Sequence, residues 1–179
     1  LEAMVETSDE WIIQRTGIKE RRIASEDHYA SDLAIAAVED LIERNSVSVD
    51  DVDQIIVTTF TPDHCTPTVA ALVQNHFGMQ NCGTFDLGAG CTGFAYGMSV
   101  ADALITSGAN KKVLVVAAET VSKVVDYEDR TTCILFGDGA AACLLEHTDD
   151  KGAFLARYFH TDGDLAQYVT CGNYSHVVN

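Results

Sequence analysis

Residues 86–97 read DLGAGCTGFAYG and place a cysteine inside a glycine-rich turn. Two kinds of chemistry fit this stretch. The glycines Gly88, Gly90 and Gly93 follow the pattern of a dinucleotide-binding loop, which joins a strand to a helix and holds a diphosphate on backbone amides. Glu119 ends the next predicted strand and is the candidate carboxylate for a ribose hydroxyl, although it lies farther along the chain than the roughly 20 residues usual for that motif. A dinucleotide-dependent oxidoreductase is therefore one hypothesis.

The second hypothesis makes Cys91 a nucleophile. A cysteine at the first turn of a helix lies at the positive end of the helix dipole, beside free backbone N–H groups, and its reactive thiolate form is favoured there. Gly88 and Gly90 would then allow the backbone angles of a sharp turn between strand and helix, and Gly93 would let a substrate or a neighbouring strand approach closely. An inert, buried cysteine at a helix start is a third alternative.

The elements that must position this turn alternate between strand and helix. Hydrophobic periodicity and capping residues predict helices over 31–45, with Ser31 as the N-cap, over 68–77 and over 92–107. Apolar and β-branched runs predict strands over 53–60, 82–87, 112–119, 139–146 and 152–159. This order predicts one α/β domain with a mainly parallel sheet. The helix over 92–107 is apolar around most of its circumference, so we expect it to be buried on nearly all sides.

The composition narrows the class of protein. The 179 residues carry a formal net charge of −16, which argues against a nucleic-acid surface. A basic run at Arg15, Lys19, Arg21 and Arg22 is the local exception and could meet an anion. No apolar run approaches the roughly 20 residues needed to span a bilayer and no signal segment opens the chain, so we expect a soluble cytoplasmic protein. The six cysteines and six histidines show no metal-ligand spacing, and we expect neither a metal nor a disulfide.

Three segments together resemble the β-ketoacyl-ACP synthase III family of the thiolase superfamily: residues 7–24 (TSDEWIIQRTGIKERRIA), 86–97 and 126–146 (DYEDRTTCILFGDGAAACLLE). The resemblance implies a thiolase-like α/β fold in which two similar halves form five αβαβα layers. It identifies residues 1–179 as one thiolase-like N-terminal domain, which we expect to be truncated at both ends. It also favours the nucleophile hypothesis for Cys91.

The resemblance implies an activity that initiates fatty acid synthesis. Cys91 would take an acyl group from acyl-CoA, and the acyl-enzyme would condense with malonyl-ACP, which loses carbon dioxide. Trp11 and Arg130 would sandwich the adenine of CoA, and Arg15 would meet its phosphates. We expect acyl-CoA as a substrate without any tightly bound cofactor, and a homodimer.

The resemblance implies roles for two further residues, and the sequence departs from the family pattern in one respect. Phe136 would lie close to the nucleophile, and Thr66 would reach into the acyl pocket of a partner subunit, where the family often has a bulkier apolar residue. The family's histidine and asparagine motifs do not occur here. The string at 171–179 is similar to one of these motifs, but it follows too soon after Cys91 to match it. We therefore expect this chain by itself to be inactive in condensation, and an inactive half that depends on a partner is the remaining alternative.

Overall fold

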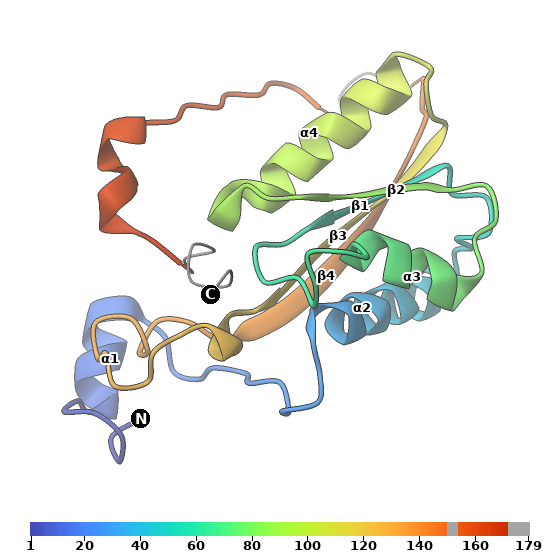
Figure 1. Ribbon diagram of the computed structural model, residues 1–179. Coiled ribbons are helices and arrows are strands. Elements are labelled where there is room, and N and C mark those ends of the chain that lie inside the picture. The colour runs from blue at the N-terminus through green and yellow to red at the C-terminus, as the bar shows by residue number, and fades with distance from the viewer. Residues whose placement is uncertain (150–153, 172–179) are drawn as a thin grey trace.

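The computed structural model describes residues 1–149 and 154–171, and its centre is a four-stranded sheet with the strand order β2-β1-β3-β4 (Figure 1). The strands are β1 (Gln54–Thr58), β2 (Gly83–Leu87), β3 (Lys112–Thr120) and β4 (Asp138–Glu146). β1 pairs in parallel with both β2 and β3, and β4 runs antiparallel beside β3. The predicted α/β architecture with a mainly parallel sheet is confirmed.

The two central strands are buried on both faces. In β1, Ile55 and Val57 pack on one side of the sheet and Ile56 packs on the other, and all three are fully buried. Residues 113–116 of β3 are fully buried as well. This double burial explains why both strands read as nearly continuous apolar runs.

Three helices cover the sheet (Figure 1): α2 (Ala30–Asn45) and α3 (Val69–Phe77) lie on one face, and α4 (Gly93–Thr106) lies on the other. The predicted end of α3 is confirmed, because Gly78 follows Phe77 in the left-handed conformation, and the helix begins one residue later than predicted, since Thr68 is its N-cap and accepts a hydrogen bond from the Ala71 amide. Gly108, which also has a positive φ, follows the end of α4.

The start of α2 differs from the prediction. The helix begins at Ala30, so Ser31 is not its N-cap. Tyr29 occupies that position, and its backbone amide donates to the Asp32 carboxylate. The Ser31 hydroxyl is used elsewhere, because it donates to Asp63 at 2.6 Å. A serine near a helix start therefore has a long-range partner that sequence periodicity does not reveal.

α4 is buried along one line of its surface. The buried positions are spaced four residues apart and face the sheet: Gly93, Gly97, Ala101 and Ile105. Phe94, the residue next to Gly93, is 39 % exposed. The expected burial on nearly all sides is not found in the described part of the chain, because the sheet covers only one side of this helix.

Residues 154–159, predicted as the end of a last strand over 152–159, are irregular; residues 152 and 153 lie outside the described residues. A strand needs a neighbouring backbone to share its hydrogen bonds, and within the described ranges no strand pairs with this segment. The segment lies instead against α4, where the Phe159 ring stacks on Tyr96 with 4.1 Å between ring centres and Arg157 pairs with Asp102. A short 3-10 helix, η3 (Gly163–Tyr168), follows.

The N-terminal segment forms a helix that periodicity did not predict, α1 (Asp9–Thr16). The Ser8 hydroxyl accepts from the Trp11 amide at its start, and Gly17 ends it. α1 packs on residues 121–137, which begin with the 3-10 helix η2 (Val121–Lys123). Ile12 and Cys133 are buried together there, so Cys133 is a small buried hydrophobic residue in a turn segment.

Candidate functional site

The turn around Cys91 leads from the carboxyl end of β2 into α4 through a 3-10 helix, η1 (Gly90–Thr92). Gly90 has φ +53°, in the left-handed region that favours glycine. Gly88 has no positive φ, so its predicted role in an unusual backbone conformation is wrong. The Cys91 side chain is exposed just before the first residue of α4, which contradicts an inert buried cysteine. The thiol is accessible at the positive end of a helix dipole.

Two glycines let α4 lie close to β1 behind this turn. A Cβ atom on Gly93 would come within 3.2 Å of Cβ of Thr58, and one on Gly97 would come within 2.7 Å of Cγ2 of Thr58. The close approach predicted for Gly93 is therefore made by a neighbouring strand. Thr58 was missed by sequence analysis, and its only signal was a polar residue at the end of an apolar strand.

Glu119 does not offer its carboxylate to a ligand. It accepts hydrogen bonds from the Phe60 amide at 3.0 Å, the Thr61 hydroxyl at 2.6 Å and the Thr59 hydroxyl at 3.2 Å. Burial raises the pKa of the Glu119 carboxyl above its usual value, although the hydrogen bonds oppose the shift. A carboxylate whose oxygens hold a neighbouring loop is not free to bind a ribose, which removes the residue on which the dinucleotide hypothesis depended.

The three residues proposed for CoA meet in space. The guanidinium carbon of Arg130 lies 5.0 Å from the centre of the Trp11 ring, and that of Arg15 lies 5.7 Å from the same centre. Both distances are within the range of cation–π contacts. The Trp11 side chain is 37 % exposed, so this cluster lies at the surface. An exposed aromatic ring offers a surface on which a purine can stack, and the two guanidinium groups beside it can attract phosphates.

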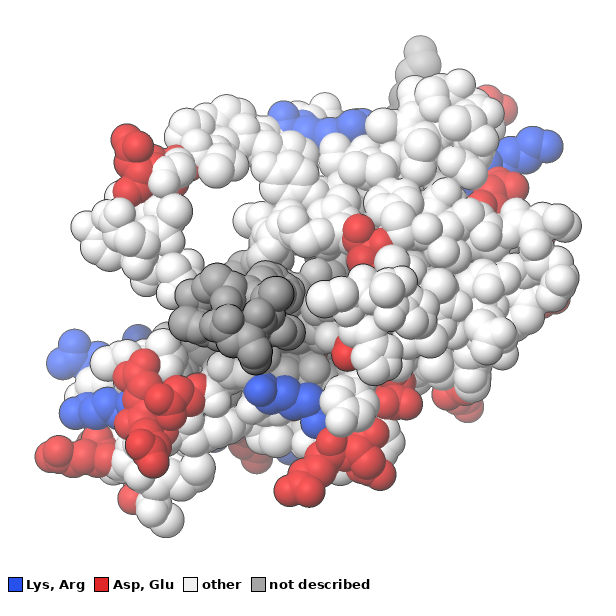
Figure 2. Space-filling view, in the orientation of Figure 1, with Lys and Arg blue, Asp and Glu red and all other residues white. Residues whose placement is uncertain are grey.

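The basic run near α1 is a mixed surface. Arg21 turns inward and donates to the Ile134 carbonyl, and the Arg22 guanidinium pairs with Glu20 at 2.9 Å. Figure 2 shows Lys and Arg interspersed with Asp and Glu in its lower left part, where Figure 1 places α1. The cluster of Trp11 with Arg15 and Arg130 is therefore a local feature, and the predicted run as a whole is not a free cationic patch.

α4 begins on the side of the molecule where α1 and residues 121–137 lie (Figure 1). The parallel strands also end on this side, which is where ligands of α/β sheets bind. Thr66 is exposed in the loop that follows β1, and the Thr66–Pro67 peptide bond is cis. Phe136 is half-buried at the end of the 121–137 segment.

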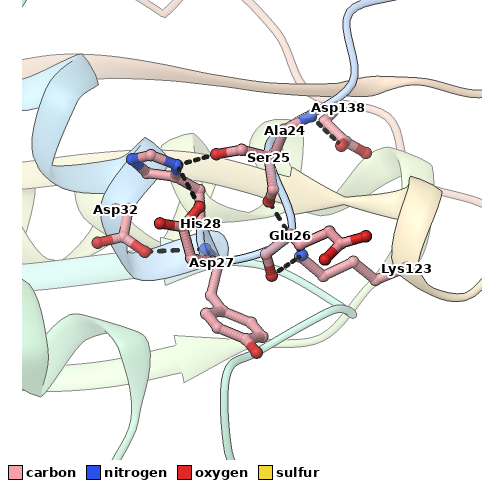
Figure 3. A network of polar contacts seen from close by, with 9 residues as sticks. Ala24, Ser25, Glu26, Asp27, His28, Asp32, Lys123 and Asp138 are labelled. Carbon is pink, nitrogen blue, oxygen red and sulfur yellow. Dashed lines mark hydrogen bonds and ion pairs between the residues drawn. The ribbon is translucent and has the colours of Figure 1, made fainter.

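A second cluster of reactive residue types lies before α2 (Figure 3). The Ser25 hydroxyl and the Asp27 carboxylate, 3.4 Å away, both contact Nδ1 of His28. A catalytic serine and its supporting carboxylate must bind opposite ring nitrogens, so this geometry does not support nucleophilic catalysis. The network instead fixes the segment before α2 to η2, because Nζ of Lys123 donates to the carbonyls of Ser25 and Glu26.

Within residues 1–149 and 154–171, no three His, Cys, Asp or Glu side chains are arranged to hold a metal ion. No helix in the same ranges has the length and apolar character required to cross a membrane.

Comparisons with known proteins agree on one family. The family model described as 3-oxoacyl-(acyl-carrier-protein (ACP)) synthase III matches residues 85–163. The chain is 52 % identical over 179 residues to beta-ketoacyl-(acyl-carrier-protein) synthase III 2 of Halalkalibacterium halodurans and 54 % identical to the protein of that name from Bacillus anthracis. These matches cover all of this chain but 54 % and 55 % of the two relatives, so the chain spans about half the length of the curated relatives it matches.

Solved structures show the same relationship. The crystallised beta-ketoacyl-(acyl carrier protein) synthase III of Thermus thermophilus superposes with a TM-score of 0.89 at 48 % identity, over 93 % of this chain and 51 % of that chain. The 3-oxoacyl-(acyl-carrier-protein) synthase III of Aquifex aeolicus gives 0.86 at 44 % identity. The fold is thiolase-like, and its mixed sheet with helices on both faces fits the N-terminal half. This chain belongs to the β-ketoacyl-ACP synthase III family.

Proposed function

We propose that this chain carries the acyl-transfer site of a β-ketoacyl-ACP synthase III, with Cys91 as the nucleophile. The Cys91 thiolate attacks the thioester carbonyl of acyl-CoA, the C–S bond to CoA breaks, and CoA leaves as a thiolate that takes up a proton. The acyl group remains on Sγ as a new thioester. The observation that carries this proposal is the exposed thiol in the glycine turn directly before α4.

The turn and the helix supply the electrostatics of this step. The N-terminal end of α4 favours negative charge on the attacking sulfur. The backbone N–H of Cys91 is a suitable donor for the oxyanion that forms on the substrate carbonyl, because it belongs to the same turn as the nucleophile. Donors that belong to the same turn as the nucleophile would need no reorganisation when the substrate arrives.

We further propose that CoA enters over the cluster of Trp11, Arg15 and Arg130. Stacking of adenine on the Trp11 ring would be supported by the guanidinium of Arg130, and Arg15 would attract a phosphate. The two cation–π contacts support this assignment, because they hold the aromatic face and both charges in one exposed cluster. No tightly bound cofactor is needed for acyl transfer from a thioester.

Condensation with malonyl-ACP is the second step of the proposed reaction. Malonyl-ACP would lose carbon dioxide, its α-carbon would attack the acyl thioester, and the products would be 3-ketoacyl-ACP and free Cys91. The family's histidine and asparagine motifs are not matched by these 179 residues. The similar string at 171–179 lies outside the described residues except for Cys171. We therefore propose that this chain by itself supports acylation but not condensation.

Two proposals concern the acyl pocket and the assembly. Phe136 would border the acyl group near the nucleophile. Thr66 would enter the pocket of a second copy in a homodimer, and its exposed position in the loop before α3 supports this role. A threonine there leaves more space than a bulky apolar side chain and would admit wider acyl groups.

Acylation is tested directly by intact-mass measurement after incubation of the 179-residue chain with acetyl-CoA. We expect one acetyl group, located on the peptide that contains Cys91 and absent from Cys91→Ser. Cys65→Ser is the matched control, because Cys65 is also exposed and should be dispensable. Acetylation of another cysteine with Cys91 unmodified would contradict the proposal.

A further inference from the structure

Asp86 lies in β2, five positions before Cys91, and its carboxylate fastens the start of α3. Oδ2 accepts from the Val69 amide at 2.8 Å, and Oδ1 accepts from the Ala70 amide at 2.9 Å. These are the first two residues of the helix, whose amides have no partner within the helix itself. A carboxylate at a helix N-terminus is also favoured by the helix dipole.

The start of α3 is the end of a loop that is fastened at several points. The loop leaves β1 at Thr59 and Phe60, where Glu119 accepts the Phe60 amide. In its middle, the Asp63 carboxylate accepts the backbone amide and the hydroxyl of Ser31 in α2. Its last segment carries Thr66 and ends where Asp86 holds α3. Side-chain carboxylates therefore determine where this loop lies.

Asp86 connects that loop to the nucleophile turn. In β2 it pairs with Val57, which faces α2 and α3, while the next residue, Leu87, packs on the α4 side. The Leu87 carbonyl accepts from the Thr59 amide at 3.3 Å, which is the last backbone contact that holds β2 before the turn begins. The Asp86 side chain therefore holds the end of β2 to the start of α3, and the Leu87 carbonyl holds it to the loop that follows β1.

We propose that Asp86 is a positioning residue for Cys91: its carboxylate holds the turn of residues 88–91 in register with α3 and with the loop that carries Thr66. This inference rests on the proposed acyl transfer and extends it. Asp86 does not touch the acyl group. It acts through the backbone, because movement of β2 relative to α3 would shift the turn that holds Cys91 relative to the loop that carries Thr66.

The chain offers a matched control in Asp53. Its carboxylate also accepts two backbone amides, from Lys111 at 2.6 Å and Lys112 at 2.9 Å. Asp53 precedes β1 and therefore lies at the amino ends of the parallel strands, opposite to the end from which Cys91 follows. Asp53→Asn and Asp86→Asn remove the same charge and weaken the same number of hydrogen bonds at the two ends of one sheet.

The experiment compares wild type, Asp86→Asn and Asp53→Asn in three measurements: the melting temperature, the rate of Cys91 alkylation by iodoacetamide, and the rate of acetylation by acetyl-CoA. We expect both variants to melt at lower temperatures. Only Asp86→Asn should slow alkylation of Cys91, by roughly threefold or more, and acetylation, by about tenfold or more, because small displacements of a reacting group have large kinetic effects. Half-saturation by acetyl-CoA should stay unchanged, since the Trp11 cluster is not altered.

Val69→Pro is the second variant, in case Asp86→Asn does not fold. Proline at the first helical position removes one of the two amides that Asp86 binds and suits the helix start. Thr68 has φ −69° and ψ 154°, a conformation compatible with a following proline. We expect this variant to slow Cys91 alkylation in the same direction.

Wild-type alkylation of Cys91 in Asp86→Asn, or an equal decrease in Asp53→Asn, would overturn the positioning role. Alkylation does not require acyl-CoA, so the two proposals fail separately. Suppose that wild type is never acetylated but that its Cys91 is still alkylated faster than Cys91 of Asp86→Asn. This result would contradict the acyl-transfer proposal and leave the positioning role of Asp86 intact.

Discussion

The guanidinium of Arg130 lies 5.0 Å from the centre of the Trp11 ring, although the two residues are 119 positions apart in the sequence. Trp11 is in α1 and Arg130 is in the segment between β3 and β4. The two segments share a small core in which Ile12, Cys133 and Ile134 are buried. This core positions the cluster that we propose for CoA.

Substitution of Arg130 tests the cluster. We expect Arg130→Ala to weaken CoA binding by about 0.5–1 kcal/mol, or roughly two- to fivefold, because a cation–π contact at an exposed site has this magnitude. Calorimetric titration with CoA at low and high salt measures the effect.

Arg15→Ala should weaken CoA binding more at low salt than at high salt, since salt screens a phosphate contact. Arg44→Ala, which removes an equal charge from α2, is the control and should leave CoA affinity unchanged.

The cysteines should differ in their rates of alkylation. Burial raises the pKa of the Cys82 thiol to about 11, and nearby Asp53 contributes to the shift. At pH 8 about one Cys82 in a thousand would be a thiolate, which is the reactive form. We expect iodoacetamide to label Cys91 much faster than Cys82, as measured by peptide mass spectrometry over time. Equal rates for the two residues would show that Cys91 is not accessible as described.

Any side chain at position 97 should destabilise the protein. We expect Gly97→Ala to lower the free energy of unfolding by about 1–2 kcal/mol, because crowding against Thr58 outweighs the better helix preference of alanine. Thr58→Ser removes the nearest methyl group and should recover part of this loss in the double variant. Gly139→Ala has open space around its Cβ and serves as the control in the same denaturation experiment.

The buried Glu119 should make stability depend on pH. In the unfolded chain its carboxyl titrates near 4.5, and burial raises its pKa in the folded chain. Between these two values the folded state binds more protons, so stability falls as the pH rises. From about pH 4.5 upward, we expect the unfolding free energy of wild type to fall relative to that of Glu119→Gln. Urea denaturation across this range measures the slope, and Glu43→Gln on the exposed side of α2 is the control. A slope of the opposite sign would contradict the assigned effect of burial.

The sequence by itself determined the order of the elements between residues 30 and 146 and the setting of the nucleophile. The apolar run in β1 and the glycines after α3 and α4 are local signals, because a strand covered on both faces needs apolar side chains throughout and a left-handed helix end favours glycine. The resemblance of the three segments then indicated the family and the role of Cys91. These features were predictable because each depends on residues that are neighbours in the chain.

Only the tertiary structure decided how distant polar residues are used. Glu119 has the position of a ribose ligand in the sequence, but the fold turns its carboxylate toward the loop after β1. Asp86 is one acidic residue in an apolar strand, and its two helix amides become visible only when α3 is packed beside β2. A carboxylate binds whichever donors the fold brings within about 3 Å, and residues far apart in the chain come that close only through packing of the elements.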